Sequence, residues 1–66
     1  MTLTINGSRR TVDGACAIGD LLQQLNLPGG AVVVELNGSI VKRGSYGTTM
    51  VRDGDAVEIV RLVGGG

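Results

Sequence analysis

Residues 31–41 have the sequence AVVVELNGSIV, and this stretch decides how the chain folds. The run Ala31–Leu36 is rich in β-branched residues and predicts a strand, because such side chains pack well on a pleated surface. Asn37-Gly38 predicts a tight hairpin turn, since a type I′ turn needs a positive φ at both central positions. The extended pattern resumes at Ile40-Val41. The stretch therefore predicts a strand, a tight turn and a second, short strand.

The N-terminal segment repeats this pattern. Met1–Ile5 alternates apolar residues with threonine, Asn6-Gly7 is a second hairpin signal, and Ser8–Val12 follows it. We therefore expect a β-hairpin at the start of the chain.

A short helix is predicted between the two strand–turn–strand segments. Four apolar residues recur there at the spacing of one helical face: Ile18, Leu21, Leu22 and Leu25. The helix is expected to begin near Ala17 and to end by Asn26, because Pro28 and the glycines after it cannot continue it.

The last third of the chain is less regular. Lys42–Arg52 has no clear period and is expected to be an irregular connection, with one turn of helix near Ser45–Gly47. Asp53-Gly54-Asp55 predicts a turn, and Ala56–Val63 predicts a final strand that leads into Gly64–Gly66.

The predicted order of elements is β-β-α-β-β-β, which indicates an α+β fold with a mixed sheet of four to five strands and one helix on one face. Residues 1–63 would form the domain, and residues 64–66 a flexible tail. Side-chain alternation assigns one set of strand residues to the helix side: Leu3, Ile5, Val32, Val34, Leu36, Val57 and Ile59. It assigns the other set to an open face: Thr2, Thr4, Val33, Glu35, Glu58, Val60 and Leu62.

Composition excludes several classes of function. Six basic and six acidic residues give no net charge, so a nucleic-acid or anionic membrane partner is not expected. There is no histidine, and Cys16 is the only cysteine, so neither a metal site nor a disulfide is expected. No apolar run is long enough to span a membrane, and a cytoplasmic location is expected.

No side chain stands out as catalytic, because general acid–base and nucleophilic chemistry need an activated group that this sequence does not supply. Asp53 and Asp55 are explained by the turn that they flank. Cys16 is more simply a packed thiol than a reactive one.

The C-terminal Leu62-Val63-Gly64-Gly65-Gly66 has two interpretations. Glycine-rich ends are often frayed or left over from cloning. Alternatively, glycines without Cβ atoms let an extended peptide thread a narrow channel and present the carboxylate of Gly66 to an enzyme. A last strand that leads directly into the glycines favours the second interpretation.

The sequence resembles the ThiS family of sulfur carrier proteins, which have the ubiquitin-like β-grasp fold and are relatives of MoaD. The resemblance covers the whole chain and rests on segments in the family's order: Leu3–Gly7, Leu21–Leu25, Val33–Gly38 with Ile40-Val41, Asp53–Val60 and Val63–Gly66.

The resemblance implies a role in thiamin thiazole biosynthesis. An E1-like, ThiF-like adenylyltransferase would use ATP to adenylate Gly66, and a persulfide donor would convert the adenylate to a thiocarboxylate. A ThiG-like thiazole synthase would then receive the sulfur. Gly64 and Gly65 would thread into the enzymes. The chain itself would be a co-substrate and not an enzyme, with no bound cofactor.

Partner docking is assigned to an exposed apolar spot of Val33, Val60 and Leu62. The alternative is that the segment Lys42–Arg52 partly covers this spot. For the function, the alternatives are a sulfur carrier for molybdopterin or cysteine synthesis, a non-covalent β-grasp binding module, and a modifier that is conjugated to proteins.

Overall fold

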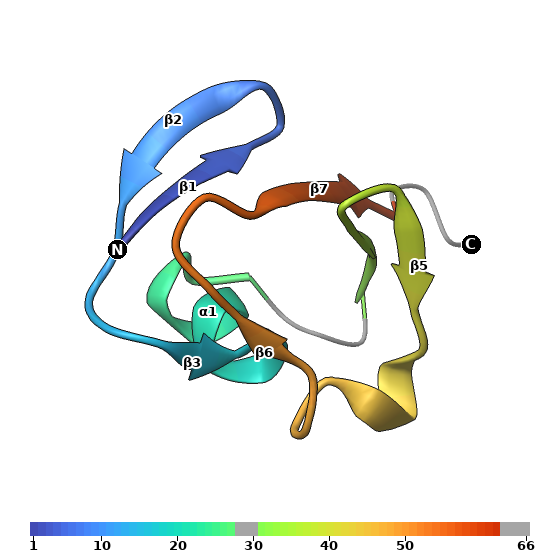
Figure 1. The fold of residues 1–66 in the computed structure, drawn as a ribbon. Helices are drawn as coiled ribbons and strands as arrows, with labels where there is room; N and C mark the ends of the chain where they lie inside the picture. The colour runs from blue at the N-terminus through green and yellow to red at the C-terminus, as the bar shows by residue number, and fades with distance from the viewer. Residues whose placement is uncertain (28–30, 63–66) are drawn as a thin grey trace.

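The computed structural model describes residues 1–27 and 31–62. A five-stranded sheet curves around one helix, and a second, two-stranded sheet lies beside that helix (Figure 1). The elements follow one another as β1 Thr2–Ile5, β2 Ser8–Thr11, β3 Cys16–Ala17, α1 Ile18–Gln24, β4 Val32–Leu36, β5 Ser39–Val41, a 3₁₀ helix Arg43–Ser45, β6 Met50–Val51 and β7 Ala56–Arg61.

The larger sheet has the strand order β2-β1-β7-β4-β5. Its central neighbours β1 and β7, the first and last strands of the chain, run parallel, and the other pairs are antiparallel. This confirms the predicted α+β, β-grasp architecture with a mixed sheet of five strands and one helix.

Both Asn-Gly turns have the backbone that the sequence predicts. The φ angles are 51° at Asn6 and 82° at Gly7, and 51° at Asn37 and 87° at Gly38. Positive φ at both positions is the condition for a type I′ hairpin. The two turns therefore fix the registers β1–β2 and β4–β5 locally.

Helix α1 begins at Ile18 and ends at Gln24, within the predicted bounds. Asn26 has a φ of 58°, its N–H donates to the carbonyl of Gln23 at 3.0 Å, and the N–H of Leu27 donates to the carbonyl of Leu22 at 2.9 Å. This pair of bonds is a Schellman motif, which terminates a helix with one left-handed residue. The chain thus leaves the helix before the proline that the prediction used as its limit.

The core lies between α1 and the concave face of the sheet. The side chains assigned to the helix side are buried in β1, β4 and β7, except that Leu36 is half-buried. Helix residues Ile18, Leu21 and Leu22 complete the core, whereas Leu25 packs at its margin.

The prediction of an irregular connection over 42–52 is wrong in part. The segment contains the 3₁₀ helix at Arg43–Ser45, slightly before the predicted helical turn, and strand β6, whose Val51 pairs with Cys16 of β3. Carbonyl oxygens of this segment also accept hydrogen bonds from the start of α1: the N–H of Gly19 donates to Tyr46 and that of Ile18 to Thr49, both at 2.9 Å. The segment therefore lies on the helix side of the sheet.

Candidate docking face

The open face of the sheet carries an apolar strip across β4, β5 and β7. Val33 of β4 lies directly opposite Val60 of β7, and their exposed fractions are 36% and 58%. Leu62, 55% exposed, is two residues beyond Val60, and its N–H donates to the carbonyl of Ala31 at 2.8 Å, so the ladder continues past the end of β7. The structure thus brings the three predicted docking residues together on one exposed surface.

Ile40 extends this strip and was not assigned to it from sequence. The β4–β5 register places Ile40 opposite Glu35, so both side chains share the open face, and Ile40 is 70% exposed. The sequence contains the information needed to place Ile40 on this face, because a two-residue Asn-Gly turn fixes which residues of a hairpin lie opposite each other. We call Val33, Ile40, Val60 and Leu62 the open-face strip.

Two carboxylates interrupt the strip. Glu35 of β4 lies directly opposite Glu58 of β7, in the row next to the Val33–Val60 pair. Glu58 is exposed and Glu35 half-buried. Sequence alternation assigned both residues to the open face, and the register adds that they form a cross-strand pair.

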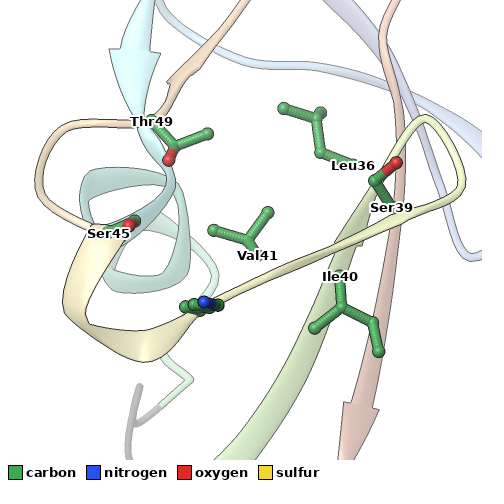
Figure 2. Close-up of a pocket in the computed structure, with 7 residues that line it drawn as sticks. Leu36, Ser39, Ile40, Val41, Ser45 and Thr49 are labelled. Carbon is green, nitrogen blue, oxygen red and sulfur yellow. The ribbon is translucent and has the colours of Figure 1, made fainter.

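A shallow cavity of about 360 Å³ lies between the β4–β5 hairpin and the 3₁₀ helix; its lining residues are Leu36, Ser39, Ile40, Val41, Lys42, Ser45 and Thr49. Figure 2 shows Val41 pointing into the space near Ser45 and Thr49, whereas Ile40 points away from them across the β5 backbone. Hydroxyls, aliphatic groups and one lysine form this lining, and they supply no general base or nucleophile with an activating partner.

The aspartates of the predicted turn have structural roles. Asp53 Oδ1 accepts a hydrogen bond from the N–H of Thr2 at 2.6 Å, and Asp55 Oδ2 accepts one from the N–H of Arg52 at 2.8 Å. Asp55 Oδ1 also accepts from Asn37 Nδ2 at 3.1 Å. This confirms the turn interpretation, and residues 1–27 and 31–62 contain no group of three or more potential metal ligands.

Cys16 belongs to β3 of the small sheet and is buried, as a packed thiol would be. Burial raises the pKa of the Cys16 thiol, and the nearby carboxylate of Asp20 raises it further. Both effects disfavour the thiolate, which is the reactive form. The thiol is therefore poorly suited to nucleophilic chemistry.

The predicted working residues Gly64, Gly65 and Gly66 lie outside the described residues. Leu62 is the last described residue before them, so the open-face strip ends four positions from Gly66 in the sequence. In the described part of the chain, no helix has the length and apolar character needed to cross a membrane.

Comparison with known proteins gives a consistent family assignment. The model of the ThiS family matches residues 3–66. A crystal structure of a thiamine biosynthesis protein (ThiS) from Geobacter metallireducens superposes with a TM-score of 0.87 at 43% identity, covering 100% of both chains. A solution structure of a thiamine biosynthesis protein from the same organism superposes with a TM-score of 0.84 at 43% identity. The match covers 100% of this chain and 88% of that one.

Two curated relatives are much longer proteins. The chain is 41% identical over 66 residues to a thiazole synthase of Paramagnetospirillum magneticum and 32% identical over 66 residues to a thiazole synthase of Magnetococcus marinus. The match covers 100% of this chain in both cases, but the chain spans only 20% of the length of each relative.

Proposed function

Because the chain belongs to the ThiS family, we propose that it is a sulfur carrier of thiamine biosynthesis whose working group is the carboxylate of Gly66. The observation that carries the proposal is the family match, which extends through residue 66, together with the likeness to a ThiS structure over its whole length. In this proposal the chain is a cytoplasmic co-substrate of other enzymes and binds no cofactor of its own.

The proposed chemistry begins with attack of a Gly66 carboxylate oxygen on the α-phosphorus of ATP in an E1-like adenylyltransferase. Pyrophosphate leaves, and the product is an acyl adenylate. The terminal sulfur of a persulfide donor then attacks the acyl carbon and displaces AMP. Reduction of the remaining S–S bond by a thiol leaves a thiocarboxylate on Gly66, which is the form that delivers sulfur.

Thiazole synthase is the proposed acceptor of that sulfur. The support comes from the two relatives named thiazole synthase, each of which contains a segment similar to this chain. Because a segment similar to this chain occurs within thiazole synthases, we infer that the carrier passes its sulfur to a thiazole synthase.

The fold limits where an enzyme that holds Gly66 can sit. Four residues follow Leu62 up to and including Gly66, and a fully extended chain of that length reaches about 14 Å at most. Gly64 and Gly65 have no Cβ atoms and can pass through a narrow channel. We therefore propose that the enzyme docks on the residues next to the tail, Val33, Val60 and Leu62.

Intact mass tests the carrier chemistry. The purified protein is incubated with an E1-like adenylyltransferase, ATP, a persulfide donor and a thiol reductant. We expect the mass change of one oxygen exchanged for one sulfur, and its loss when Gly66 is deleted. An unchanged mass with an enzyme that is active on another carrier would overturn the proposal in favour of a non-covalent module.

Substitution tests the docking assignment separately. Val60→Asp and Leu62→Asp each introduce a charge that would lose its water when the enzyme docks on the open-face strip. Docking should therefore weaken, and Gly66 should be modified more slowly when enzyme is limiting. Met50→Asp is the matched control, because Met50 is an exposed apolar residue of β6 and lies outside the open-face strip. Unaltered rates for folded Val60→Asp and Leu62→Asp variants would show that docking occurs elsewhere.

A further inference from the structure

The paired glutamates of the open face have an unfavourable arrangement in the isolated protein. Residues directly opposite on antiparallel strands have Cβ atoms about 4.5–5.5 Å apart, and like charges at such positions are destabilising. Glu35 and Glu58 occupy such positions. None of the side-chain hydrogen bonds among residues 1–27 and 31–62 involves either carboxylate.

Within β4, β5 and β7, no basic side chain shares the open face with the two carboxylates. Arg61 is the one basic residue of β4, β5 and β7, and it lies opposite Val32, whose side chain faces the core. Lys42, just after β5, is two residues beyond Ile40, so alternation places it at the β5 edge of the open face; no side-chain hydrogen bond joins it to either carboxylate in the described residues. On the β1 side, Arg9 of β2 is separated from β7 by β1, a distance of about 10 Å at ordinary strand spacing.

Apolar side chains surround the two carboxylates. The Val33–Val60 pair forms the adjacent row towards Leu62, and Ile40 lies beside Glu35 at the β5 edge. A partner that covers this strip would remove water from around the carboxylates. Charged groups inside a desolvated interface need an opposite charge with good hydrogen-bond geometry, or they weaken binding.

We propose that Glu35 and Glu58 together bind one cationic side chain, an arginine, that projects from an apolar docking surface of the adenylyltransferase. A guanidinium has several N–H donors in one plane and can bind two neighbouring carboxylates at once. The inference rests on the proposed function, because that enzyme is the partner that must reach Gly66 from beside the open-face strip.

Other occupants fit this surface less well. A second copy of the chain docked face to face would oppose its own glutamates to these two. Nucleic acids and anionic lipid surfaces would be repelled by the pair. The pairing of carboxylates with apolar side chains is complementary to a protein surface that combines a cation with apolar groups.

The proposal predicts opposite effects on stability and binding. Glu35→Gln and Glu58→Gln remove the repulsion while keeping the side-chain shape, so the urea midpoint of the free protein should stay constant or rise. Affinity for the E1-like adenylyltransferase, measured by calorimetry, should fall about ten-fold or more for each variant, because a charge-assisted bond at an interface is lost. The double variant should also lose most of the salt dependence of binding.

Asp13→Asn is the matched control, because it makes the same charge change at an exposed loop residue away from this face. It should bind as the unaltered chain does. Wild-type affinity and salt dependence in the folded glutamine variants would overturn the proposed site. That result would leave the carrier function standing if Gly66 is still converted to the thiocarboxylate, whereas failure to modify the unaltered chain would contradict the carrier function itself.

Discussion

The side-chain amide of Asn6 forms hydrogen bonds with the backbone of β7. Its Oδ1 accepts a hydrogen bond from the N–H of Ile59 at 2.7 Å, and its Nδ2 donates to the carbonyl of the same residue at 3.1 Å. The amide therefore pairs with the β7 backbone as a peptide group would. The same residue sets the φ of the hairpin turn, so one asparagine connects the first hairpin to the last strand.

Asn6→Gly isolates the contribution of these two bonds. Glycine accepts the φ of 51° at this position, so the loss of about 1–3 kcal/mol in the free energy of unfolding comes mainly from the missing hydrogen bonds. Asn6→Ala should lose about 1–2 kcal/mol more, because alanine is strained in the left-handed region. Urea unfolding measures both values, and a midpoint for Asn6→Gly equal to that of the unaltered chain would contradict the role of the side chain.

Cys16 should be unreactive at neutral pH. Its thiol pKa is raised by burial and by the Asp20 carboxylate, so the thiolate is scarce in the folded protein. Alkylation by iodoacetamide at neutral pH should therefore be slower than in urea. Asp20→Asn should lower the thiol pKa and speed alkylation in the alkaline range; an unchanged rate would show that Asp20 has no influence.

The same pKa direction fixes the sign of the pH dependence. When the pKa of a thiol is higher in the folded state than in the unfolded state, its contribution to stability is fully present at any pH below the unfolded-state pKa. That contribution is lost as the pH rises through the folded-state pKa. The urea midpoint should thus decline in the alkaline range, and decline less in Cys16→Ala, which cannot ionise there.

At the scale of elements, helix α1 contains a glycine that its position does not require. A Cβ added to Gly19 would lie 3.5 Å from the carbonyl oxygen of Tyr46, an ordinary contact distance, and its φ is not positive. Gly19→Ala should therefore raise the free energy of unfolding by about 1 kcal/mol through helix propensity. In thermal unfolding of a domain of this size, that gain corresponds to roughly 4–8 °C.

The contrasting substitution is Gly54→Ala. Gly54 has a φ of 89°, so alanine is strained there although no atom lies within 4 Å of the added Cβ. The same glycine-to-alanine change should thus stabilise the helix and destabilise the turn. Equal effects at the two sites would contradict the assignment of helical backbone to Gly19.

The predictable elements are those whose signal lies within a few consecutive residues. The Asn-Gly turns, the alternation in β1 and β7 and the helical spacing of Leu21, Leu22 and Leu25 are all local. By contrast, β3 and β6 are two residues each, and their strand geometry comes from pairing with each other, Cys16 with Val51 and Ala17 with Met50. No short window of sequence contains that information, so the segment 42–52 was predicted to be irregular.

Tyr46 illustrates the same limit for a single side chain. It lies among polar and glycine residues, yet it is buried, and its hydroxyl donates to the carbonyl of Val32 at 3.4 Å. Tertiary contacts with α1 and β4 determine this position. The open-face strip was predictable for Val33, Val60 and Leu62 by alternation, whereas the pairing of Glu35 with Glu58 required the β4–β7 register.

For the whole molecule, folding and the proposed chemistry depend on different parts of the chain. The buried apolar side chains of the described residues run from Leu3 to Ile59, and the proposed working residue is Gly66. Deletion of Gly65-Gly66 should therefore change the free energy of unfolding by no more than about 0.5 kcal/mol. The same deletion should abolish modification by the adenylyltransferase, because the carboxylate would then stand on Gly64 and fall about 7 Å short of the reacting position.

The measurement is urea unfolding combined with intact mass after incubation with the enzyme, ATP, a persulfide donor and a thiol reductant. Val57→Ala is the matched variant for stability: it removes buried methyl groups from the core and should lower the unfolding midpoint while leaving Gly66 a substrate as long as the protein is folded. A large loss of stability on removing Gly65-Gly66 would show that the tail belongs to the folded body. If the shortened chain is still modified, modification does not depend on the length of the tail between Leu62 and the terminal carboxylate.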